Sequence, residues 1–128
     1  MSKQIIQTTK VPAPIGPYSQ AVIANGFLFA SGQVAFDPLT GELVLDSIQA
    51  ETKQVMENIK AILEEAGLSF SHIVKTTIFL SDMQLFANVN EVYGSYFTAD
   101  FPARETVAVK TLPRNVNVEI SVTAVTNL

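Results

Sequence analysis

Residues 46–80, DSIQAETKQVMENIKAILEEAGLSFSHIVKTTIFL, decide the fold because they hold a one-sided helix followed closely by a strand. The apolar side chains of the first part recur every three or four residues and so share one helix face: Val55, Ile59, Ile62, Leu63 and Ala66. Asp46 or Ser47 can cap the start of this helix, and Gly67 can end it in a left-handed conformation. The stretch from Ile73 to Leu80 is rich in β-branched residues and predicts a strand.

Two apolar runs before the helix predict a β-hairpin. Ala21 to Ala24 and Phe27 to Ser31 flank Asn25-Gly26, the dipeptide that best provides the two positive φ angles of a type I′ turn. Lys3 to Thr8 predicts a further short strand. The stretch from Val11 to Tyr18 contains several prolines, which predict a rigid loop of a kind that often holds ligands.

A second helical stripe begins near Met83 and cannot continue past Pro102. Its apolar members are Phe86, Val89, Val92, Tyr93, Tyr96 and Phe97. Two strands, Thr106 to Lys110 and Val116 to Val125, are predicted to follow, joined by a turn through residues 112–115.

The predicted order is strand, hairpin, helix, strand, helix and two strands, within a single domain that spans residues 1–128. Each helix has one apolar stripe, so both are expected to cover the same face of one mixed sheet. This is an α+β domain of two layers. The other face of the sheet is left without cover, which points to a subunit interface.

The composition also favours a subunit interface. Charged residues make up 16% of the chain, against about 25% in typical domains, and the mean hydropathy is +0.28. A monomer with so few charges would struggle to keep its surface polar. The formal net charge of −4 has the wrong sign for binding phosphates, so nucleic-acid partners are not expected.

Metal and cofactor chemistry has little support in the sequence. Cysteine is absent and His72 is the only histidine, which disfavours zinc sites and catalytic triads. The glycines occur in separate turns and lack the spacing of a phosphate-binding loop. We therefore expect no metal and no cofactor. The sequence has neither a signal-peptide pattern nor an apolar run of about 18–20 residues, so we expect a soluble cytoplasmic protein.

Glu119 is the first candidate for catalysis. In the last strand it shares a face with Asn117, Ser121 and Thr123, opposite the apolar face. A carboxylate on a strand is usually a solvated surface group, and that is one interpretation. If the uncovered face of the sheet packs against another subunit, Glu119 becomes partly desolvated and can orient or deprotonate a water molecule.

Arg104 is the second candidate. It lies at the entry to the preceding strand, close to Pro102, whose ring restricts the local backbone. A fixed guanidinium is a planar, two-pronged donor suited to a small carboxylate. A surface ion pair with Glu105 or Asp100 is the competing interpretation.

Three further polar side chains lie at loop or element ends and can join such a pocket: Tyr18, Ser31 and Asn88. Their residue types alone do not establish a site. Tyr93 and Tyr96 lie on the apolar stripe of the second helix and are expected in the core.

Several stretches together resemble the RidA (YjgF) family of reactive-intermediate deaminases, in order and over essentially the whole chain. They are APIGPYSQA at 13–21, FASGQ at 29–33, the helix around Gln54 to Asn58, Pro102-Ala103-Arg104, and Leu112-Pro113 leading to Val118-Glu119-Ile120. The resemblance is more specific for the family than for one activity, because members are described as imine deaminases, translation inhibitors and regulators.

The resemblance implies a chorismate-mutase-like α+β fold and a homotrimer with a site in each cleft between subunits. It implies that Arg104 holds the substrate carboxylate and that Glu119 positions the attacking water. It further implies that the cleft is lined by Tyr18, Ser31, Gly32, Asn88 and Thr106. Some relatives carry cysteine at the position of Thr106, so a thiol-dependent side activity is not expected here.

The implied activity is hydrolysis of 2-iminobutanoate, 2-iminopropanoate and their enamine tautomers to 2-oxo acids and ammonia. Imine hydrolysis needs no metal, nucleotide or pyridoxal. Two alternatives stay open. One is a regulatory trimer that binds small carboxylates without turnover; the other is a ribonuclease or translation inhibitor, which conflicts with the negative charge.

Overall fold

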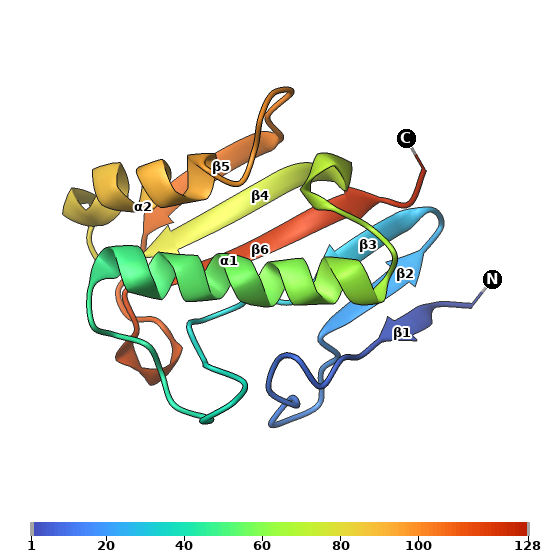
Figure 1. Ribbon diagram of the computed structural model, residues 1–128, viewed down its shortest axis with the longest axis horizontal. Coiled ribbons are helices and arrows are strands. Elements are labelled where there is room, and N and C mark those ends of the chain that lie inside the picture. The colour runs from blue at the N-terminus through green and yellow to red at the C-terminus, as the bar shows by residue number, and fades with distance from the viewer. Residues whose placement is uncertain (1, 128) are drawn as a thin grey trace.

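The computed structural model describes residues 2–127 as one six-stranded sheet with two helices across one face (Figure 1). The strands are β1 (Gln4–Ile6), β2 (Ala21–Ala24), β3 (Phe27–Ala30), β4 (Ile73–Leu80), β5 (Ala103–Ala108) and β6 (Val118–Val125). The helices are α1 (Ile48–Glu65) and α2 (Phe86–Gly94). Short 3-10 turns lie at Phe70–His72, Met83–Leu85 and Pro113–Asn115.

The strand pairing makes the sheet mixed. The strand order is β1-β2-β3-β6-β4-β5. β4 and β5, which α2 connects in the chain, are parallel, and the other neighbouring pairs are antiparallel. β6, the last strand in the chain, lies between β3 and β4, so it joins the two halves of the sheet. The expected α+β architecture, with both helices on one face, is confirmed (Figure 1).

The hairpin and the long helix form as the sequence predicts. Asn25 and Gly26 have φ angles of 53° and 83°, the two positive values that a type I′ turn needs. The Ser47 side chain caps α1 by accepting a hydrogen bond from the backbone N–H of Ala50, and Gly67 follows the helix with a φ of 74°. The apolar stripe of α1 is buried in the core under the sheet.

Several predicted bounds differ from the structure by one or two residues, and two elements differ more. α2 ends at Gly94, a weak helix former, so Tyr96 and Phe97 lie in the turn after the helix. Their rings still pack in an aromatic cluster, in which Tyr96 contacts Phe70 and Phe97 contacts Tyr93. The strand predicted at 106–110 is β5 at 103–108. β5 is an edge strand with no buried residue, so it lacks the alternation of apolar and polar residues that reveals a strand.

The face of the sheet away from the helices is uncovered and carries exposed apolar side chains among polar ones. Phe27, Phe29 and Val107 lie on it with 40%, 46% and 43% of their surface exposed. Leu28, between the two phenylalanines, points the other way and is fully buried. Large apolar side chains exposed on an open sheet face are typical of a surface that meets another protein chain.

A buried carboxylate joins the start of α1 to the start of β6. Glu51, in the first turn of the helix, is only 1% exposed. Its carboxylate accepts hydrogen bonds from the backbone N–H groups of Asn117 (2.8 Å) and Val118 (3.3 Å), and from the side-chain amide of Asn117 (2.8 Å). These bonds fix the point at which β6 enters the sheet, just before Glu119.

Replacing Glu51 by leucine is expected to lower the free energy of unfolding by roughly 2–4 kcal/mol, because the donors of Asn117 and Val118 lose their acceptor. Urea unfolding followed by circular dichroism measures the change. Glu64→Ala, at an exposed position near the end of the same helix, is the matched control and is expected to stay within about 0.5 kcal/mol of the wild type. Equal stability of Glu51→Leu and the wild type would contradict the anchoring role.

Candidate functional site

Arg104 is held against α2 on the helix-covered side of the sheet. It is the second residue of β5 and pairs in register with Thr76 of β4. Its Nη1 donates a hydrogen bond of 2.7 Å to Oδ1 of Asn90. Its guanidinium carbon lies 5.4 Å from the ring centroid of Phe86 and 5.3 Å from that of Tyr93. Two aromatic rings and one amide oxygen therefore give the guanidinium a defined place.

Arg104 makes no salt bridge with any residue in the range 2–127. Glu105 points to the other face of the sheet, where it pairs with Lys75 at 3.1 Å and accepts a hydrogen bond of 2.6 Å from the Thr77 hydroxyl. The guanidinium instead borders a cavity of about 400 Å³. The cavity is also lined by Asn90, Tyr93, Gly94, Phe101 and Pro102. The guanidinium thus keeps N–H donors for a planar anion.

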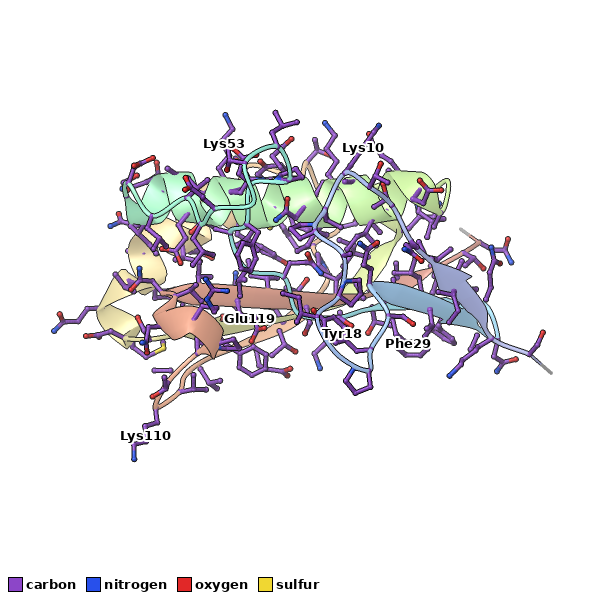
Figure 2. All side chains as sticks on the ribbon, turned by 90° about the horizontal axis from the view of Figure 1, so that it is seen from below. Lys10, Tyr18, Phe29, Lys53, Lys110 and Glu119 are labelled. Atoms are coloured by element: carbon purple, nitrogen blue, oxygen red, sulfur yellow. The ribbon has the colours of Figure 1, made fainter. Side chains whose placement is uncertain are left out.

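Glu119 lies on the opposite, uncovered face of the sheet, away from α1 (Figure 2). Its carboxylate packs directly on Gly32, because a Cβ added there would lie 2.7 Å from Oε2. Any other residue at position 32 would displace the carboxylate. Partial burial raises the pKa of Glu119 above its ordinary value. A carboxylate with a raised pKa is a stronger base toward water.

The proline-rich loop places further polar groups on the uncovered side of the sheet. Tyr18 and Ser31 border a hollow of about 540 Å³ there. Gln20, which is buried, holds the loop: its Oε1 accepts a hydrogen bond of 2.7 Å from the N–H of Thr8, and its Nε2 donates one of 3.1 Å to the carbonyl of the same residue. The Ser31 hydroxyl donates to the carbonyl of Ser19 at 2.6 Å. Gly32, on which the carboxylate of Glu119 packs, directly follows Ser31 in the chain.

Within one chain, the sheet separates the two main candidate groups. Arg104 pairs in register with Thr76 of β4, whereas Glu119 pairs in register with Phe79 of the same strand. Residues 76 and 79 point to opposite faces, because successive side chains of a strand alternate. Arg104 therefore faces α2 and Glu119 faces away from it. A site that uses both groups must be formed by two copies of the chain.

α2 brings Asn90 to Arg104 within one chain, whereas the role of Asn88 in lining a cleft between subunits stays a prediction. Asn88 is exposed and borders neither the cavity nor the hollow. Asn90 lies four residues after Phe86 and three before Tyr93, so the three share the helix face that meets the guanidinium. This spacing is visible in the sequence and is the signal that could have identified Asn90.

Thr106 lies on the same face of β5 as Arg104, two residues further on. Its hydroxyl oxygen is buried and finds no hydrogen-bond partner among residues 2–127. An unpaired buried hydroxyl is uncommon and is available to a bound molecule. Tyr93 lies in the core as expected, but its ring also borders the cavity beside Arg104.

Metal-binding and membrane-spanning features were not found between residues 2 and 127. No three His, Cys, Asp or Glu side chains there are placed to hold a metal ion. His72 instead has a local structural role, because its Nδ1 accepts a hydrogen bond of 3.1 Å from the backbone N–H of Ser69. No helix in the same part of the chain is long and apolar enough to cross a membrane.

Comparison with known proteins gives consistent matches over almost the whole chain. The family model described as Endoribonuclease L-PSP matches residues 8–126. A mouse protein named 2-iminobutanoate/2-iminopropanoate deaminase is 47% identical over 123 residues, which cover 96% of this chain and 91% of the mouse protein. A crystal structure from Thermotoga maritima matches with a TM-score of 0.94 at 50% identity, covering 98% of both chains. E. coli TdcF, solved with bound serine, matches with a TM-score of 0.91 at 42% identity, covering 95% of this chain and 98% of TdcF.

The two carboxylates on the uncovered face are expected to respond to pH in opposite ways. The Thr77 hydroxyl and Lys75 lower the pKa of Glu105, so its contribution to stability is present at pH 7 and is lost as the pH falls through that lowered pKa. Burial raises the pKa of Glu119, so its contribution is present below the ordinary glutamate pKa of about 4.3 and is lost as the pH rises through the raised pKa.

Glu105→Gln is therefore expected to be less stable than the wild type at pH 7, and Glu119→Gln more stable. Both differences should shrink as the pH falls from 7 toward 3, because the wild-type carboxyls take up protons in that direction. Urea unfolding midpoints at pH 7 and pH 3 measure them. A shift of the same sign for both variants at pH 7 would refute the opposite assignments.

Proposed function

We propose that this chain, which belongs to the Endoribonuclease L-PSP family, also called YjgF/RidA, hydrolyses reactive 2-imino acids to 2-oxo acids and ammonia. The observation that carries the proposal is a guanidinium with N–H donors to spare on one face of the sheet and a partly desolvated carboxylate on the other. Arg104 keeps donors beside a cavity, and Glu119 has a raised pKa. The name of the mouse relative and the serine bound to TdcF support a small, amino-acid-like substrate.

We place the active site between the subunits of a homotrimer. Arg104 and Glu119 lie on opposite faces of one sheet, so a neighbouring chain must bring one to the other. β5 is the last strand of the sheet, which puts Arg104 at an edge that a neighbour can reach. The exposed phenylalanines Phe27 and Phe29 give the neighbour an apolar surface to pack on.

The reaction needs few groups. Arg104 binds the carboxylate of a 2-imino acid, for which 2-iminobutanoate and 2-iminopropanoate are the simplest choices, through a two-pronged pair of hydrogen bonds. Once the imine nitrogen is protonated, its carbon is electrophilic. Glu119 takes a proton from water as the water oxygen bonds to that carbon, and the carbinolamine forms. Glu119 then returns the proton to the nitrogen. As the C–N bond breaks, the carbinolamine hydroxyl gives its proton to Glu119, and ammonia and a 2-oxo acid leave; this proton, equal to the one that protonated the imine, passes to solvent.

The other residues line this cleft. Tyr18, Ser31 and Gly32 come from the Glu119 side, and Thr106 comes from the Arg104 side with its unpaired hydroxyl. Asn90 joins them as the asparagine that contacts the guanidinium, and we keep Asn88, exposed on the same helix, as a further lining residue of the cleft. No metal or organic cofactor enters the proposed steps.

RNA cleavage, which the family name Endoribonuclease L-PSP suggests, fits this chain less well. Its net charge of −4 opposes the approach of a phosphate backbone. We further propose that the protein acts in the cytoplasm, where reducing conditions suit a chain without cysteine.

An assay in which a pyridoxal-dependent dehydratase generates 2-iminobutanoate tests the function. The wild type is expected to accelerate formation of 2-oxobutanoate over buffer. Glu119→Gln should lower kcat by roughly 10²–10⁴-fold, because general-base catalysis contributes about that much. Arg104→Ala should lower kcat/KM by about 10–100-fold, the effect of losing a charge-assisted hydrogen-bonded pair.

Lys53→Ala is the control for loss of a positive charge, since Lys53 projects from the outer side of α1 (Figure 2). It should behave as the wild type. If the wild type binds 2-oxobutanoate but accelerates no imine, the chain is a carboxylate-binding protein and the proposed activity is wrong.

A further inference from the structure

We propose that Tyr93 and Thr76 are positioning residues that hold the guanidinium of Arg104 in the orientation that receives the substrate carboxylate. The inference rests on the proposed function for its substrate, but its geometry is independent of the reaction. Neither residue is assigned a chemical step in the proposed reaction. They act through Arg104, and therefore through binding.

Arg104 needs such support. It is exposed, and in the range 2–127 it has no carboxylate partner to orient it. Asn90 contacts one nitrogen only, which leaves the plane of the guanidinium free to turn about that bond. A long arginine side chain that is not held loses conformational entropy each time it binds an anion. The rings of Phe86 and Tyr93 are the surfaces that restrict this motion.

Tyr93 is the more firmly held of the two rings. It is 3% exposed, and its hydroxyl donates a hydrogen bond of 3.0 Å to Oγ1 of Thr76, which is fully buried. Thr76 is also the register partner of Arg104 on the adjacent strand. The ring is thus fixed by α2 at one end and by the strand beside Arg104 at the other, so the hydroxyl bond sets the position of the ring face relative to the guanidinium.

The chain offers a matched control in Tyr96. Its hydroxyl also makes a side-chain hydrogen bond, of 2.7 Å to Glu57, and its ring also packs in the aromatic cluster. Unlike Tyr93, it has no cation–π contact with Arg104. Tyr93→Phe and Tyr96→Phe each remove one hydroxyl, which in Tyr96 also lies 3.5 Å from the carbonyl of Lys53, but only the first change reaches Arg104.

The experiment measures steady-state kinetics with 2-iminobutanoate and calorimetric binding of 2-oxobutanoate, using the full chain. Tyr93→Phe and Thr76→Val are each expected to raise KM by about 3–10-fold, with kcat within about twofold of the wild type, because the guanidinium contacts the carboxylate before and during the reaction. Kd for 2-oxobutanoate should rise by the same factor. Tyr96→Phe should leave all three values unchanged.

The double variant separates positioning from two independent effects. Tyr93→Phe combined with Thr76→Val should be no weaker in binding than either single variant, because both remove the same hydrogen bond. If Tyr93→Phe lowers the melting temperature while KM and Kd stay at wild-type values, the hydroxyl bond is only structural and the proposal is overturned.

Failure of the proposed function would be seen separately. A wild type that binds 2-oxobutanoate without hydrolysing the imine loses its proposed activity, yet a weaker Kd in Tyr93→Phe would still support positioning. A wild type that neither hydrolyses the imine nor binds 2-oxobutanoate overturns both proposals, since Arg104 would then have no carboxylate to receive.

Discussion

The two-faced geometry of β4 is the constraint on which the rest of the structure depends. From Thr76 to Leu80, alternate side chains are fully buried under the helices, and those between them turn to the open face. Because β5 and β6 pair with β4 in register, their side chains alternate in the same way. Arg104 on β5 therefore points to the helix-covered face, and Glu119 on β6 points to the open face. A slip of one residue in either ladder would move the functional side chain to the wrong face.

Features that depend on a few neighbouring residues could be predicted from the sequence. The turn at Asn25-Gly26, the capped α1 and the alternation that puts Glu119 opposite the core each have a short-range signal. The placing of both helices on one face also follows from their single apolar stripes. In these places local preference and tertiary packing agree.

Features that depend on distant partners could not be predicted. β5 is defined by its pairing with β4, so its start and the side taken by Arg104 appear only once that register is known. Glu105 was a sensible partner for Arg104 by proximity in sequence, yet strand alternation sends the two to opposite faces. The contact of Asn90 with Arg104 joins α2 to β5 and needs the helix position as well as its period.

The division of the site between two faces has a consequence for inheritance. In the proposed trimer, each chain lends its guanidinium to one site and its carboxylate to another. A chain mutated at Arg104 and a chain mutated at Glu119 would therefore each remove a different one of the two groups that a site needs. When two such defective copies assemble together, some clefts receive an intact half from each, and a cell carrying both alleles regains part of the function that either allele alone has lost.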